Sequence, residues 1–100
     1  MEFSQHFLFG LLYIIFPFIL LYNYKFTRYF ENEVLQKRPY LKKQWCIAIL
    51  ENPEKEELQE NNRYRFWGKV DELDGKYIRV VTLEDKITIH NAFPDRRFTP

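Results

Sequence analysis

An uncharged run of apolar residues near the N-terminus constrains this chain more than any other feature. From Phe7 to Tyr22 the sequence reads FLFGLLYIIFPFILLY without a charged side chain, and the uncharged stretch continues to Tyr24, where Lys25 ends it. A helix that crosses the hydrocarbon core needs about 20 residues, with about 17 as a practical minimum. Residues 7–24 are therefore just long enough to form a single transmembrane helix.

The residues on either side of this run favour a membrane anchor. Tyr22 and Tyr24 stand where an interfacial aromatic belt would fall, and Lys25 and Arg28 follow them, whereas Glu2 is the only charged residue ahead of the run. An excess of positive charge marks the cytoplasmic side of a membrane helix. We therefore expect a single-pass protein with its N-terminus outside and its C-terminal domain in the cytoplasm.

Other interpretations of residues 1–23 stay open. The gene start can lie too far upstream, in which case this hydrophobic leader is absent from the working protein and the protein is cytoplasmic. The run can also be a buried hairpin or a core helix of a soluble domain. A secretory signal peptide is disfavoured, because the basic n-region and the small-residue cleavage site are both absent.

Composition excludes several classes of protein. A chain of 100 residues is one domain at most, which excludes a multidomain enzyme. Hydrophobic residues at 46% and aromatic residues at 19% are too many for a disordered chain, whereas a mean hydropathy of -0.46 is too polar for a protein lying wholly in a membrane. The net charge of +1 does not indicate a strongly charged partner.

Few residues are available for metal or cofactor chemistry. Cys46 is the single cysteine, and His6 lies far from His90 in the chain, so neither a disulfide nor a zinc cluster is expected. The only glycines are Gly10, Gly68 and Gly75, too few and too scattered for a phosphate-binding loop. We expect no metal and no cofactor.

The segment after the leader begins with helical patterns. Residues 22–26 are a candidate strand and Thr27 is a candidate N-cap for a helix that runs to about Lys37, where Pro39 prevents its continuation. A second helix is expected from about Leu41 to Asn52-Pro53. Its apolar stripe consists of Leu41, Trp45, Ala48 and Ile49.

Strand patterns follow a polar connection over residues 54–62. Residues 63–70 alternate, with Tyr64, Phe66 and Val70 on one face and Arg63, Arg65, Trp67 and Lys69 on the other. Asp74-Gly75 predicts a turn, 77–83 a central strand and Glu84-Asp85 another turn. In a last strand that ends at Pro94, Ile87, Ile89, Asn91 and Phe93 alternate with Thr88, His90 and Ala92. Residues 24–100 are thus predicted to form an α+β domain in which two helices cover an antiparallel three-stranded meander.

The runs RYFENEVLQKRPYLKKQWCIAILENP, RYRFWGKV and GKYIRVVTLEDKITIHNAFPDRRF carry a resemblance that covers Tyr24 to Phe98. Its most specific parts are RVVTLED and HNAFPDRRF. The segment resembles a family of small bacterial and cyanobacterial domains of uncharacterised activity that look related to the RelE/ParE toxin superfamily. This resemblance implies a β-α-α-β-β-β order, here preceded by the N-terminal hydrophobic helix.

RelE-like toxins are ribosome-dependent ribonucleases, so the resemblance implies RNA binding or endoribonuclease activity as an expectation. Attack of a 2′-hydroxyl on the adjacent phosphate needs an acid and a base, and cations over the developing charge. His90 is the candidate acid or base, because its ordinary pKa lies near physiological pH, and Arg65 is its catalytic partner. The candidate nucleic-acid-binding residues are Arg63, Trp67, Arg79, Arg96 and Arg97, of which Trp67 could stack on a base.

Each of these residues also has a structural interpretation. His90 can be a hydrogen-bonded structural residue, Arg63 and Arg65 can provide solubility and edge protection, and Asp95 can close a turn by pairing with the arginines that follow it. Leaving out Glu2 raises the net charge only from +1 to +2, which is low for an RNA-directed toxin. The alternative function is therefore a non-catalytic, membrane-tethered interaction module that binds a partner such as an antitoxin-like peptide by strand addition.

Overall fold

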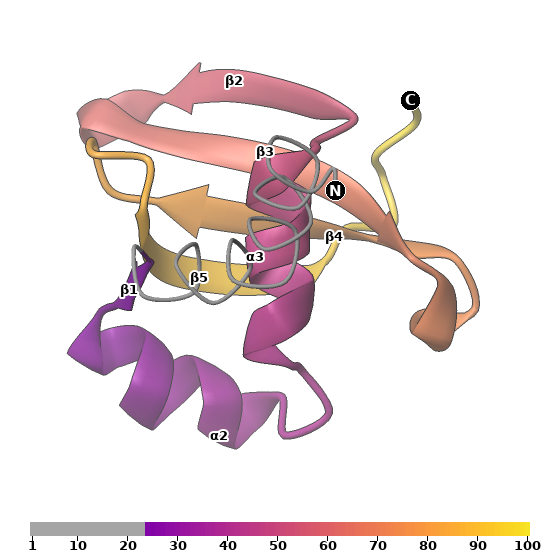
Figure 1. The fold of residues 1–100 in the computed structure, drawn as a ribbon, viewed down its shortest axis with the longest axis horizontal. Coiled ribbons are helices and arrows are strands. Elements are labelled where there is room, and N and C mark those ends of the chain that lie inside the picture. Colours follow the sequence, from indigo (N-terminus) through magenta and orange to yellow (C-terminus); the bar gives the residue numbers. More distant parts are fainter. Residues whose placement is uncertain (1–23) are drawn as a thin grey trace, which may run out of the picture.

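The computed structural model describes residues 24–100, which form an α+β domain (Figure 1). The leader, and with it all but the last residue of the expected transmembrane helix over residues 7–24, lies outside the described residues. Within residues 24–100, none of the helices has the length and apolar character needed to cross a membrane.

One five-stranded sheet forms the main layer. Its strands are β1 (Lys25–Phe26), β2 (Lys55–Gln59), β3 (Arg63–Val70), β4 (Lys76–Thr82) and β5 (Thr88–Pro94), in the order β1-β5-β4-β3-β2. The last three strands form the predicted antiparallel meander, whereas β1 pairs in parallel with β5. The sheet is therefore mixed, with β1 and β2 at its edges.

The edge strand β2 corrects the predicted polar connection over residues 54–62. Glutamate is a weak strand former. The side chains of β2 are mostly exposed and therefore mostly polar, so the sequence shows no alternation of apolar and polar residues that would predict a strand. The pairing with β3 explains why it forms, because all five residues of β2 have a partner there. Asn61 and Asn62 make the connecting turn with φ values of 66° and 59°, a left-handed conformation that asparagine tolerates.

The first helical segment covers residues 28–37 and begins at the predicted cap. The Phe30 backbone N–H donates to Thr27 Oγ1 at 3.0 Å. The middle of the segment, Phe30–Val34, is π-helical, and the last turn is α2 (Leu35–Lys37). The segment stops as expected ahead of Pro39, with Arg38 outside the helical region at φ -128° and ψ 72°.

Helix α3 (Lys43–Glu51) packs across one face of the sheet (Figure 1). It starts two residues later than predicted, and Ala48 is exposed rather than part of the buried stripe. Ala48 is exposed because α3 directs the next residue, Ile49, onto β3 at Gly68. An added Cβ at Gly68 would lie 2.6 Å from Ile49 Cγ1. The shared core contains Phe30, Val34, Cys46, Ile49, Phe66, Ile78, Val80, Ile89 and Ala92.

Strand β5 has a β-bulge at His90. The register of β4 against β5 shifts by one residue there, which leaves His90 as the extra residue. The predicted alternation, which placed Ile89 and Phe93 on one face, is therefore wrong. Ala92 is fully buried, as Ile89 is, and Phe93 lies on the opposite face, directly across from Arg79.

Candidate functional site

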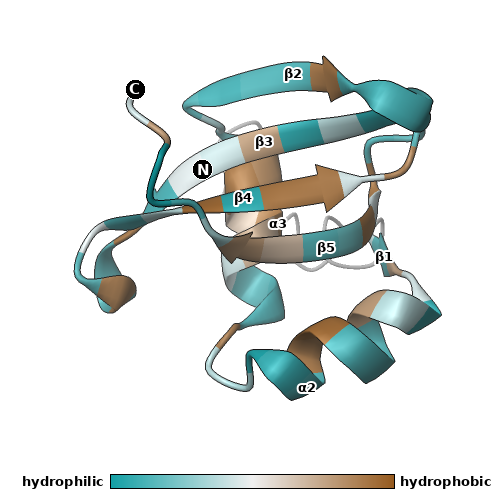
Figure 2. Cartoon of the chain, turned by 180° about the vertical axis from the view of Figure 1, so that it is seen from behind, coloured by the Kyte–Doolittle hydropathy of each residue, from teal (hydrophilic) through white to brown (hydrophobic). Residues whose placement is uncertain are grey.

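The sheet face away from α3 collects most of the predicted site residues. Directly opposed residues of antiparallel strands share a face, so Lys55, Trp67, Arg79 and Phe93 form one row across four strands. A second row contains Glu57, Arg65, Val81 and Asn91, and the pair Gln59 and Arg63 begins a third. We call these ten residues the outer face; Figure 2 views the sheet from this side, with α3 behind it.

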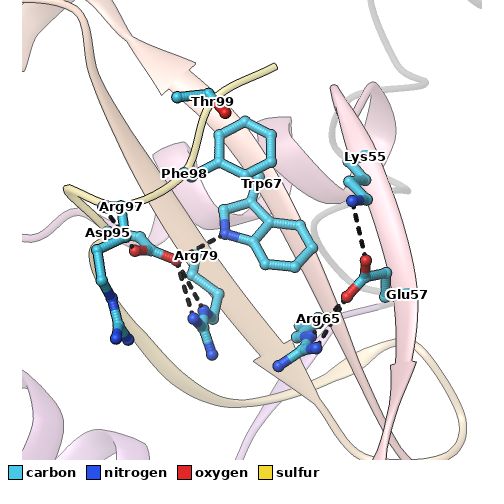
Figure 3. Close-up of a pocket in the computed structure, with 9 residues that line it drawn as sticks. All are labelled: Lys55, Glu57, Arg65, Trp67, Arg79, Asp95, Arg97, Phe98 and Thr99. Carbon is cyan, nitrogen blue, oxygen red and sulfur yellow. Dashed lines mark hydrogen bonds and ion pairs between the residues drawn. The ribbon is translucent and has the colours of Figure 1, made fainter.

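A concavity of about 410 Å³ opens on the outer face where the segment after β5 folds back toward β2 and β3 (Figure 3). It is lined by Lys55, Glu57, Arg65, Trp67, Arg79, Asp95, Arg97, Phe98 and Thr99. Strands β2, β3 and β4 contribute the first five of these side chains. Residues separated by more than forty positions in the sequence therefore meet in one hollow.

The carboxylate of Asp95 fixes one side of the concavity. Asp95 Oδ2 accepts the Trp67 Nε1–H at 2.9 Å and the Arg79 Nε–H and Nη2–H at 3.1 and 2.9 Å, while Oδ1 accepts the Arg97 backbone N–H at 3.1 Å. The hydrogen bond from Trp67, together with the Arg79 guanidinium, holds the pKa of Asp95 below its ordinary value despite burial. Asp95 is thus an ionised anchor that sets the plane of the indole.

On the opposite side, Glu57 links two basic residues. Arg65 Nη2 lies 2.8 Å from Glu57 Oε1, and Lys55 Nζ lies 2.9 Å from Oε2. These hydrogen bonds, the one from Lys55 first, lower the pKa of Glu57. The three side chains are about one third to one half exposed, so a stronger anion can compete with Glu57 for both cations.

Trp67 occupies the middle of the concavity, although only 5% of its surface is exposed. The Phe98 ring stacks on it, with ring centroids 5.0 Å apart and an angle of 12° between the planes. Lys55 Nζ, Arg65 Cζ and Arg79 Cζ lie 5.9, 5.5 and 5.4 Å from the indole centroid. The indole is thus covered by one aromatic ring and approached by three cations.

The lining residues give the concavity a positive excess. Four of them are basic and two are acidic, and both carboxylates accept hydrogen bonds from basic neighbours. Arg97 is exposed, and its side chain forms no ion pair with another described residue. The hollow therefore suits an anionic ligand with a flat group.

His90 lies apart from this concavity. Its Nδ1 is 3.1 Å from Thr27 Oγ1, and its ring stacks on Tyr29 with centroids 4.9 Å apart. Burial, and then the positive charge of Arg63, lower the pKa of His90, so the ring is neutral at pH 7. The bulge explains this placement, because it gives His90 a position with no partner on β4.

The other six predicted residues are divided among three places. Arg65, Trp67, Arg79 and Arg97 line the concavity, whereas Arg63 stands at the start of β3 and acts electrostatically on His90. Arg96 lines a separate hollow of about 170 Å³, which shares Asp95 and Phe98 with the first. The structure therefore brings four of the seven candidate residues together.

Sequence reasoning missed Lys55, Glu57 and Phe98. The first two belong to β2, where the sequence predicts a polar connection, and the Asn61-Asn62 turn is the signal that could have identified a hairpin there. Phe98 gave no signal, because its contact with Trp67 depends on how the segment after β5 turns back. Asp95 does pair with an arginine, but that residue is Arg79 on β4.

Other reactive groups are few in the described part of the chain. Among residues 24–100, no three His, Cys, Asp or Glu side chains come close enough together to hold a metal ion. Burial raises the pKa of the Cys46 thiol to about 12, so this cysteine is an inert core residue at neutral pH.

Comparison of the chain with protein-family profiles, with curated proteins and with solved structures finds no match in any of the three.

Proposed function

We propose that residues 24–100 form an RNA-binding domain whose outer face takes the backbone of a single strand. The observation that supports this most directly is the approach of three cations, Lys55, Arg65 and Arg79, to within 6 Å of the Trp67 ring. Proteins that bind single-stranded nucleic acid combine cations that follow the phosphates with aromatic rings on which bases stack. The concavity offers both groups side by side.

The near-neutral charge of the whole chain is compatible with this proposal, because the charges are unevenly distributed. The outer face has one acidic strand residue, Glu57. It has four basic residues: Lys55, Arg63, Arg65 and Arg79. The other glutamates of the acidic stretch near β2 lie elsewhere; Glu56, for example, pairs with Lys86. A polyanion approaching the outer face therefore meets a basic surface.

Binding is better supported than cleavage. Arg65 and Asn91, the neighbour of His90, are two strand spacings apart, which is about 10 Å. Arg65 also donates a hydrogen bond to Glu57 on β2, and β2 lies on the opposite side of β3 from β5, the strand that carries His90. A relation to the RelE/ParE superfamily stays part of the proposal, since a strand, two helices and an antiparallel meander follow in that order, with β2 as an additional strand.

The test is the binding of a fluorescently labelled single-stranded RNA to the full chain in a nonionic detergent. Arg65→Gln should weaken binding about tenfold to 150-fold, the loss of one charge-assisted phosphate contact. The matched control is Lys43→Gln, which removes a cation of α3 that pairs with Glu31 and lies outside the concavity. A plot of the logarithm of the association constant against the logarithm of the salt concentration should have a slope of about -2 to -3, as expected for three or four phosphate contacts to a single strand. An equal loss of RNA affinity in Arg65→Gln and Lys43→Gln would contradict the proposal.

A second candidate function is protein binding by strand addition at β2. This strand is at the edge of the sheet, and its Leu58 is 63% exposed, the most exposed of the large hydrophobic residues described. An antitoxin-like peptide could extend the sheet there. In capture experiments from a cell extract with the full chain, Leu58→Lys should then lose a bound protein that Arg65→Gln retains.

We further propose that residues 7–24 tether the domain to the cytoplasmic side of a membrane. The uncharged run and the basic residues that follow it support this assignment. If it is correct, the full chain should stay in the membrane fraction after alkaline carbonate extraction. Complete release by carbonate would contradict the proposed tether.

A further inference from the structure

We propose that the face of the Trp67 indole is a nucleobase site, and that the Phe98 ring occupies this site until a base displaces it. The inference rests on the proposed RNA binding and adds to it the way in which the site is opened. It assigns Phe98 the role of an intramolecular competitor.

The geometry of the pair is that of a base on an aromatic side chain. The planes of Trp67 and Phe98 are 12° from parallel at a centroid separation of 5.0 Å, within the range of offset stacking. The indole cannot turn away, because its Nε1–H is held at 2.9 Å by the buried carboxylate of Asp95. A flat ring that replaced Phe98 would therefore find a surface already fixed in orientation.

The charges around the indole select a nucleotide over an uncharged aromatic ligand. Lys55 and Arg65 share the single carboxylate of Glu57, and both remain partly exposed beside the ring. A base stacked on Trp67 would bring its own phosphates within reach of these two cations. Arg97 lines the same concavity and could join them.

The segment that carries Phe98 is held weakly. Two hydrogen bonds tie it to Asp95. The Arg97 N–H donates to the side-chain Oδ1 at 3.1 Å, and the Phe98 N–H donates to the backbone carbonyl at 3.3 Å, which is longer than an ordinary bond. Arg96, Arg97 and Thr99 are exposed, so Phe98 is the residue through which this segment packs. Tyr77 supports the Phe98 ring at a tilt, with centroids 5.1 Å apart. Release of Phe98 thus requires no change in the sheet.

The experiment measures the binding of a labelled single-stranded RNA, and of an abasic strand of the same length, to the full chain in a nonionic detergent. Phe98→Ala removes the competitor and should tighten binding of the RNA about threefold to tenfold, the contribution of one aromatic stack. It should leave binding of the abasic strand unchanged. Phe98→Trp should weaken RNA binding, because a larger ring competes better.

The control is Tyr40→Ala, which removes an aromatic ring that is 45% exposed and lies outside the concavity. It should change neither affinity, and thermal unfolding of each variant verifies that the fold is retained. If Phe98→Ala binds RNA no more tightly than the unaltered chain, or gains as much for the abasic strand, the inference is overturned while Arg65-dependent binding still stands. If no variant binds RNA, both the proposed function and the inference fall.

Discussion

Replacement of Asp95 by Asn tests how the outer face is held together. The carboxylate side chain is 6% exposed, and its partner Arg79 is 18% exposed, so the pair is largely shielded from water. Asn keeps an acceptor for the Trp67 N–H but leaves the guanidinium without an anion. Hydrogen bonds to charged groups contribute about 1.5 to 3 kcal/mol each, and some water reaches Arg79, so we expect a loss of about 2 kcal/mol in the free energy of unfolding. For a domain of this size, the loss lowers Tm by roughly 8 to 16 °C.

The effect should depend on pH in a defined direction. The pKa of Asp95 in the folded protein lies below the value of about 3.9 in an unfolded chain, so its stabilisation is fully present above that pH. It is lost as the pH falls through the folded-state pKa. The difference in stability between the unaltered chain and Asp95→Asn should therefore be constant near pH 7 and shrink below about pH 4.

The assay is urea unfolding of the full chain in a nonionic detergent, followed by tryptophan fluorescence from pH 7 to pH 2. Asp71→Asn, the same chemical change at an exposed residue, serves as the control and should cost less than about 0.5 kcal/mol. The reasoning would be refuted by an Asp95→Asn protein as stable as the unaltered chain at pH 7. A stability difference that persists unchanged at pH 2 would refute it equally.

Three further predictions concern the core and the helical cap. Gly68→Ala should destabilise the domain by about 1 to 3 kcal/mol in urea unfolding, because the new methyl group collides with Ile49. Thr27→Ala should cost about 1 kcal/mol through loss of the cap and should also shift the proton titration of His90 observed by NMR, because Thr27 Oγ1 contacts its ring. Cys46 should react with a thiol reagent at pH 8 only at the rate of global unfolding, since its pKa of about 12 and its burial leave no accessible thiolate; rapid labelling of the folded protein would contradict this.

Local signals in the sequence predicted the elements that depend on neighbouring residues. The Thr27 cap, the end of the first helical segment before Pro39 and the Asp74-Gly75 turn all lie where the sequence placed them. Each of these is decided within a few residues, by a side-chain oxygen, a missing N–H or a left-handed backbone conformation. The antiparallel meander follows from such turns, because tight connections leave few other topologies.

The features that the sequence did not predict depend on contacts between residues that are distant in the chain. Strand β2 exists because β3 offers it a partner, and the exposed position of Ala48 follows from the contact of α3 with Gly68. The bulge at His90 has no local signal, yet it reverses the alternation of β5 and separates His90 from the arginines of the concavity. The alternation of β3 did identify Arg65 and Trp67, since a strand of period two fixes their common face whatever its neighbours are.

The parallel pairing of β1 with β5 has a consequence for the order in which the domain folds. Lys25 and Thr88 are paired across nearly the whole domain, and the contact between Thr27 and His90 spans 63 positions in the chain. Closing so long a loop costs conformational entropy before any contact compensates for it, whereas the β3–β4–β5 meander forms from short connections. We therefore expect the meander to assemble first and the β1 edge to join it last. Substitutions in β1 should then accelerate unfolding and leave the folding rate almost unchanged.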